Sequence, residues 1–127
     1  MTANDVMGQC KEDLNGTSYM QMQMDKYDEL LTNVTTTMGK VYINFIATMD
    51  FSYIHYIQQT TEYCKTLHNI LSEGGCIDKN NVTDAELQIM SHNILVFNEM
   101  LHNMAAKWHD KLQASGRKDV AVQMHDF

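Results

Sequence analysis

Proline is absent from the 127-residue chain, and glycine occurs only six times. Proline breaks helices and glycine weakens them, so their scarcity favours long uninterrupted helices over turn-rich β architecture. The length is that of one domain, since domains of about 100–150 residues are the commonest. The composition therefore predicts a single all-α domain.

Basic residues are also scarce, with nine Lys and Arg against sixteen Asp and Glu and a net charge of −7. An acidic surface repels phosphate backbones and anionic lipids, so we expect no nucleic-acid partner. No run of about 18 apolar residues exists, so we expect no membrane span. The charge instead suits a protein partner.

Cysteine occurs three times, at Cys10, Cys64 and Cys76. The number is odd, and the spacings fit no known metal or disulfide framework, so reduced thiols are expected. Residues 1–11 lack the apolar stretch of a signal peptide. These observations predict a cytoplasmic protein, and they leave secretion by a leaderless route open.

One apolar series, at alternating steps of four and three, predicts a long helix over residues 17–73. It contains Met20, Met24, Tyr27, Leu31, Val34, Met38, Val41 and Phe45. Three threonines and Gly39 are expected to bend or break this helix near residues 35–39. Residues 41–57 have high strand propensity, but they contain no turn signal for a hairpin, so we favour the helix.

A second helix is predicted over residues 83–114, where Thr83 and Glu86 match the capping box. Its apolar series is Leu87, Met90, Ile94, Phe97, Leu101, Met104 and Trp108. Residues 74–82 are expected to form a loop, and residues 115–127 a loose tail. With a short amino-terminal helix in residues 1–16, the predicted fold is a long antiparallel, coiled-coil-like helical hairpin or a small helical bundle.

The two predicted helices differ in length, so part of their apolar surface needs cover, either from helices folded back in a bundle or from another chain. Eleven methionines suit either a surface adaptable to varied partners or an ordinary, loosely specified core. We therefore expect a protein-interaction module, such as a chaperone, adaptor, inhibitor or secretion-apparatus component. It would bury a partner helix or form a homo-oligomer. The expected interface residues are Tyr53, Tyr56, Phe97, Met100, Met104 and Trp108.

A metal-binding helical bundle is the alternative. Glu99 and His102 share a helix face, as ligands do in carboxylate-bridged di-iron bundles, and His92 and His109 lie on nearby stripes. These four residues fall outside the apolar seam, and no second pair with this spacing exists, so a solvated polar face is favoured. We expect no cofactor and no catalytic residues, and therefore no enzyme.

Overall fold

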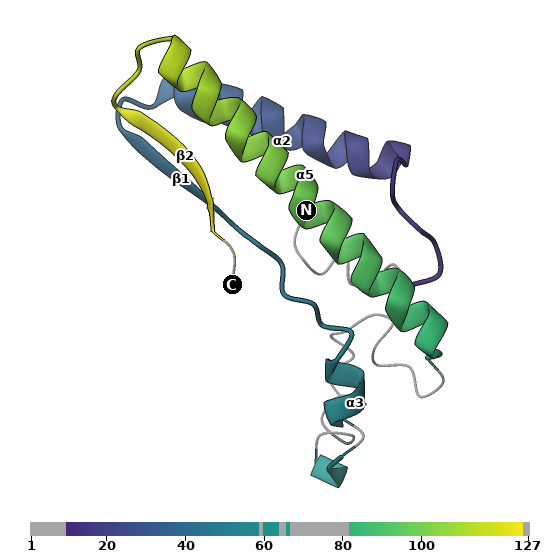
Figure 1. Cartoon of the computed structure of the whole chain (residues 1–127). Coiled ribbons are helices and arrows are strands. Elements are labelled where there is room, and N and C mark those ends of the chain that lie inside the picture. Colours follow the sequence, from purple (N-terminus) through teal and green to yellow (C-terminus); the bar gives the residue numbers. More distant parts are fainter. Residues whose placement is uncertain (1–9, 59, 64–65, 67–81, 126–127) are drawn as a thin grey trace. The chain divides into compact units, whose positions relative to one another are not determined.

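The computed structural model describes residues 10–58, 60–63, 66 and 82–125 (Figure 1). Their elements are helix α2 (Ser18–Thr37), strand β1 (Val41–Ile46), helix α3 (Ile54–Gln58), helix α5 (Asp84–Ala114) and strand β2 (Val120–His125). The chain divides into two compact units. The first unit comprises Met1–Asn15 and Thr48–Val96, and the second comprises Gly16–Ala47 and Phe97–Phe127. Helix α5 therefore contributes its first part to one unit and its second part to the other.

The all-α prediction is wrong, because the described residues include a sheet. Strands β1 and β2 pair in parallel, in a register that runs from Val41 opposite Val120 to Ile46 opposite His125. The helix predicted over residues 17–73 ends instead at Thr37, and the tail predicted to be loose contains β2. The fold is thus mixed α and β, and it is not a helical hairpin.

Helix α2 ends where the sequence predicted a bend or a break. The hydroxyls of Thr35, Thr36 and Thr37 each donate to a carbonyl one turn earlier, at 2.7–2.8 Å. Such back-bonding, together with β-branched side chains, weakens a helix. Met38 is already extended, with φ −103° and ψ 139°, although its N–H still donates to the helix. Gly39 follows, and the chain turns into β1.

The strand β1 was mistaken for helix because a step of four residues fits both structures. Val41 and Phe45 share a face in a helix, and they also share a face in a strand, since four residues are two strand periods. In the structure burial alternates residue by residue along β1, with Val41, Ile43 and Phe45 half-buried. The segment's β-branched and aromatic residues suit this strand.

The core of the second unit lies between helices and sheet. Thr17 caps α2 by accepting a hydrogen bond from the Met20 N–H at 3.4 Å. The buried apolar residues are Met20, Met24 and Leu31 of α2, Phe97, Leu101, Met104, Ala105, Trp108 and Leu112 of α5, and Val120 and Val122 of β2. One stripe of each helix and one face of the sheet therefore build this core.

Helix α5 corresponds to the helix predicted over residues 83–114, and local signals define both of its ends. The Glu86 carboxylate accepts from the Thr83 N–H at 2.8 Å, and the Glu86 N–H donates to the Thr83 hydroxyl at 3.3 Å. At the other end Gly116 has φ +70°, and the Arg117 N–H donates to the Leu112 carbonyl at 3.2 Å. This is the Schellman motif, which needs a left-handed residue that glycine supplies.

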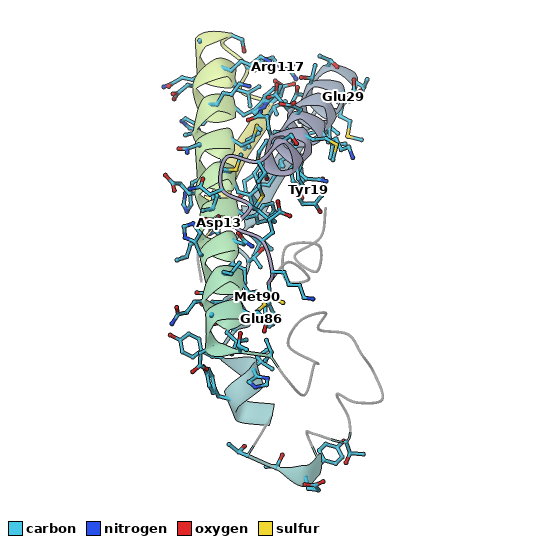
Figure 2. The ribbon with its side chains drawn as sticks, turned by 90° about the vertical axis from the view of Figure 1, so that its right-hand side faces the viewer. Asp13, Tyr19, Glu29, Glu86, Met90 and Arg117 are labelled. Carbon is cyan, nitrogen blue, oxygen red and sulfur yellow. The ribbon has the colours of Figure 1, made fainter. Side chains whose placement is uncertain are left out.

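In the first unit, a buried amide ties residues 10–15 to α5. Asn93 is 0% exposed. Its Oδ1 accepts from the Leu14 N–H at 2.8 Å, and its Nδ2 donates to the Glu12 carbonyl at 2.9 Å. Figure 2 labels Met90 and Glu86, which lie on the same part of α5. Residues 10–15 are not helical, so the predicted amino-terminal helix does not include them, and residues 1–9 lie outside the described residues.

Cys10 corrects the prediction of reduced thiols. Its side chain is 1% exposed and is disulfide-bonded. Cys64 and Cys76 lie outside the described residues, as does the predicted loop up to residue 81. The prediction of a cytoplasmic location rested partly on reduced thiols. The disulfide at Cys10 takes away that support, because disulfides are rare in cytosolic proteins. Of the helices that the structure describes, none has the length and apolar character needed to cross a membrane.

Replacing Asn93 by alanine should strongly destabilise the protein. The substitution removes the buried hydrogen bond from the Leu14 N–H and the part-buried hydrogen bond to the Glu12 carbonyl, and it empties a fully buried side-chain position. Such a loss typically costs about 2–4 kcal/mol. Urea unfolding followed by circular dichroism measures the loss. Asn103→Ala, at an exposed position of α5, is the matched control and should cost at most about 0.5 kcal/mol. An equal loss of unfolding free energy in the two variants would show that the hydrogen bonds of the Asn93 amide do not stabilise the fold.

Candidate functional site

The sheet of the second unit has one covered face and one exposed face. On the covered face Val120 and Val122 are 6% and 2% exposed, whereas Tyr42 and Ile46 on the other face are 61% and 58% exposed. Figure 1 draws the two strands side by side. We call the exposed surface the open sheet face. It consists of Tyr42, Asn44 and Ile46 of β1 and Ala121, Gln123 and His125 of β2.

Apolar exposure on this face is unusual for a parallel sheet. Parallel sheets are normally covered on both faces, and a lone pair of strands is only marginally stable. Here Tyr42 and Ile46, which lie four residues apart on the same face of β1, are both exposed to solvent. A large apolar side chain exposed in this setting is typical of a surface that another polypeptide covers.

The outer edge of β1 carries backbone groups directed away from β2. The Val41 N–H donates to the Asp119 carbonyl at 3.0 Å, and the Ala47 N–H donates to the His125 carbonyl at 2.9 Å. In a parallel ladder the residues between alternate in direction, so the N–H and C=O groups of Tyr42, Asn44 and Ile46 point outward. No third strand exists among the described residues to receive them.

This edge lacks the usual protection against strand pairing. Natural edge strands carry a charged residue, a proline or a bulge that discourages another strand. Residues 41–46 contain no charge and no proline, and their register with β2 is continuous. The β1 edge is therefore a template for an added strand.

The end of α5 and strand β2 line a hollow. Its volume is about 200 Å³. The lining residues are His109, Leu112, Gln113, Arg117, Val120, Ala121 and Val122. The end of α5 and strand β2 are thus close neighbours in the second unit.

Positive charge gathers at the amino ends of both strands. A shallow hollow of about 580 Å³ there is lined by Lys40, Val41, Tyr42, Lys118, Asp119, Val120 and Ala121. The Arg117 guanidinium binds the Asp119 carboxylate through two hydrogen bonds, at 2.6 and 2.8 Å. Hydrogen bonding from Arg117 is the main cause of the lowered pKa of Asp119, so this carboxylate stays ionised and paired. Lys40 and Lys118 are left as the exposed cationic groups of this end.

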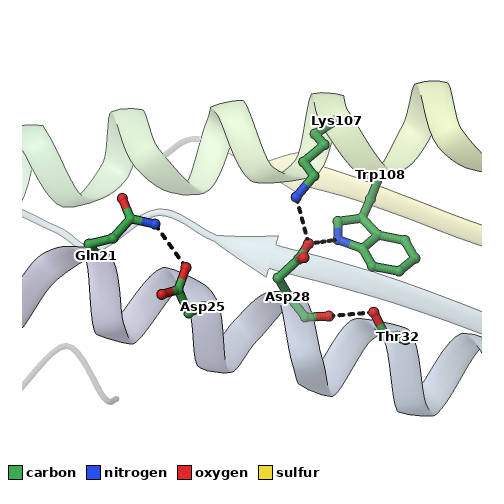
Figure 3. A network of polar contacts seen from close by, with 6 residues as sticks. All are labelled: Gln21, Asp25, Asp28, Thr32, Lys107 and Trp108. Carbon is green, nitrogen blue, oxygen red and sulfur yellow. Dashed lines mark hydrogen bonds and ion pairs between the residues drawn. The ribbon is translucent and has the colours of Figure 1, made fainter.

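Beneath the site, a charged network joins α2 to α5 (Figure 3). One oxygen of the Asp28 carboxylate accepts from the Trp108 indole N–H at 2.7 Å and from the Lys107 ammonium at 2.9 Å. The Lys111 ammonium lies 3.9 Å from the centre of the Trp108 ring, in a cation–π contact. The hydrogen bond from Lys107, followed by that from Trp108, lowers the pKa of Asp28 against the opposing effect of burial.

The structure does not gather the six expected interface residues on one surface. Phe97, Met104 and Trp108 are 3%, 8% and 1% exposed, so they belong to the core, and Met100 is half-buried. Tyr53 and Tyr56 are exposed but belong to the first unit, where the Tyr56 hydroxyl donates to Asp84 at 2.7 Å. Tyr42 and Ile46 were not among the expected interface residues, although reading residues 41–46 as an alternating strand would have revealed them.

The four weak metal candidates lie on exposed positions of α5. His92 is 3.6 Å from the Asp13 carboxylate, while Glu99, His102 and His109 face solvent further along the helix. Within the described ranges, no group of three or more His, Cys, Asp or Glu side chains is arranged to hold a metal ion. The geometry of these residues is that of a polar helix face.

Known proteins offer no guide to this site. No protein-family model, no curated protein and no solved structure matches the chain. A function must therefore be argued from the arrangement of the chain's own residues.

The Asp28 network should make the second unit sensitive to acid. The folded pKa of Asp28 lies below the ordinary value of 3.8, so its stabilisation is complete above pH 3.8 and is lost as the pH falls through the lower, folded pKa. Trp108 is the only tryptophan and reports this directly. Its fluorescence should change with a midpoint below 3.8.

Asp28→Asn should remove that transition, because the amide does not titrate. Asp25→Asn is the control, since Asp25 is exposed and accepts from Gln21 on the same helix. Circular dichroism in parallel separates the local titration from general unfolding. An unchanged fluorescence transition in Asp28→Asn would contradict the assignment to this carboxylate.

Proposed function

We propose that this chain is a protein-interaction module that binds an extended polypeptide segment along the β1 edge and the open sheet face. The observation that carries the proposal is an uncharged, unprotected edge strand that exposes Tyr42 and Ile46. The expectation of a partner is kept, but the binding element is different. The apolar stripe of α5, expected to receive a helix, is buried within the chain.

Strand addition uses both kinds of group that the site offers. The outward N–H and C=O groups of β1 supply backbone hydrogen bonds, and alternate side chains of the added segment pack beside Tyr42 and Ile46. Full burial of a large apolar side chain stabilises by about 1.5–3 kcal/mol, but the ordering of a flexible segment offsets much of this gain. We therefore expect affinities in the micromolar range.

Charge favours a particular kind of segment. The second unit has six Lys and Arg against seven Asp and Glu, whereas the first has three against nine. The net charge of −7 is thus concentrated in the first unit, and the sheet-bearing unit is nearly neutral. Lys40 and Lys118 at the amino ends of the strands favour a carboxylate at that end of the bound segment. The preferred ligand is a neutral, alternating segment with one acidic end.

A peptide selection tests this proposal. The full-length protein, immobilised, is used to select from a displayed library of random peptides. Enriched peptides should alternate apolar residues and carry an acidic residue near one end. Every second residue of a bound peptide directs its N–H toward β1. N-methylation of this set of amides should abolish binding, whereas N-methylation of the other set should leave binding intact.

Asn44→Pro is the decisive variant. It removes an outward N–H and places a ring at the edge, where proline is compatible with a strand. Affinity for selected peptides should fall at least about tenfold, by roughly 1.4 kcal/mol or more. Tyr42→Lys should also weaken binding, and Ala106→Lys, on the exposed side of α5, should not. Circular dichroism verifies the folding of each variant. Peptides that bind Asn44→Pro as well as wild type would refute strand addition.

A further inference from the structure

We infer that the β1 edge also accepts a second copy of this chain, in an antiparallel pairing centred on Asn44. The two copies would form a four-stranded sheet in the order β2, β1, β1, β2 across a two-fold axis. This inference rests on the proposed function, because it uses the same edge, and it names one specific partner. Its support comes from the order of side chains along β1 and the charge of the second unit.

The outward-facing residues of β1 are self-complementary. With the two-fold axis at Asn44, Tyr42 lies opposite Ile46 of the partner subunit, and the converse pair forms by symmetry. All the outward N–H and C=O groups then fall in hydrogen-bonded pairs, with about six backbone hydrogen bonds. A shift by two residues would pair Tyr42 with Asn44 of the partner subunit and leave Ile46 beyond the end. The centred register therefore uses the whole strand.

Side chains on the open sheet face fit the same register. An aromatic residue opposite a β-branched residue is a favourable cross-strand pair, and here it occurs twice. The Asn44 side-chain amide has both a donor and an acceptor, so it hydrogen-bonds to its own symmetry mate. Tyr42 and Ile46, 61% and 58% exposed in one chain, would each gain cover from the other copy.

Charge permits this pairing despite the acidity of the chain. Residues 41–46 are uncharged, and the second unit has nearly equal numbers of basic and acidic residues. In the antiparallel arrangement the two Lys40 side chains lie at opposite ends of the joined strands, about 26 Å apart along the strand direction. That distance exceeds the screening length of about 8 Å at physiological salt, so they do not repel. A parallel arrangement would bring them together.

The assembly should stop at two copies and remain weak. Both β1 edges are used in the pair, so a two-fold assembly of this kind leaves no β1 edge for a third copy. The joined strands are only about 20 Å long, so the buried area falls at the low end for specific interfaces. We expect a dissociation constant on the order of 100 µM.

Sedimentation velocity of the full-length protein from about 10 µM to about 1 mM tests association directly. Wild type should shift from monomer to dimer across this range, as should Ala106→Lys. Asn44→Pro should remain a monomer. A wild-type chain that stays monomeric throughout, or an Asn44→Pro variant that dimerises as wild type does, would overturn the inference.

Photo-crosslinking tests the register. Benzoylphenylalanine in place of Tyr42 should link two copies, with the link mapping to residues 45–47 of the other copy. An equal mixture of isotope-labelled and unlabelled protein distinguishes links between copies from links within one. The same probe in place of Tyr53, which is exposed in the first unit, is the control and should give no such link. Links between copies that avoid β1 would overturn the register.

The two proposals fail in distinguishable ways. If selected peptides bind wild type and lose affinity for Asn44→Pro while the wild-type chain remains monomeric, strand addition stands and the second copy is rejected. If peptides bind Asn44→Pro unchanged while wild type dimerises through β1, the pairing stands and foreign segments are rejected as ligands.

Discussion

The parallel pairing of β1 with β2 is the contact on which the second unit depends. It joins two segments that lie far apart in the sequence, and each follows shortly after a helix. Parallel strands need a long crossover, here supplied by everything between Ile46 and Val120. The pairing also determines where α2 and α5 must end, because both strands start at the same end of the sheet. Lys40 follows Gly39 before β1, and Arg117 and Lys118 follow Gly116 before β2. Their positive charges therefore lie together at the amino ends of the two strands.

Helix α5 was predictable because its information is local. The capping box, the apolar stripe and Gly116 lie within the helix or beside it, and no distant residue is needed to interpret them. The sheet was not predictable for the opposite reason. Each strand has only six residues, a step of four suits helix and strand alike, and neither segment reveals its partner in the sequence. Non-local pairing, and not intrinsic propensity, decided the structure of residues 41–46.

The candidate site was missed for a related reason. Phe97 and Trp108 were expected to anchor a partner because large rings dominate interfaces, yet both occupy the apolar stripe of α5. Residues on such a stripe are claimed first by the chain's own core, and Trp108 also satisfies its N–H within the chain through Asp28. Tyr42 and Ile46 become visible as surface residues only when residues 41–46 are recognised as a strand with one covered face.

Most of the negative charge and the exposed sheet lie in different units. The first unit holds most of the negative charge, together with the buried amide of Asn93 and the disulfide-bonded Cys10. The second unit is nearly neutral and bears the unprotected strand. Negative charge spread evenly over the chain would oppose association at every surface. Because the charge is concentrated in the first unit, short-range hydrogen bonds and apolar contacts can act at β1. A strand edge without a charge or a proline would be a hazard for aggregation, unless its pairing is limited by geometry. The proposed pairing of two β1 edges would supply that limit, because a two-fold contact uses both edges and leaves none for a further copy.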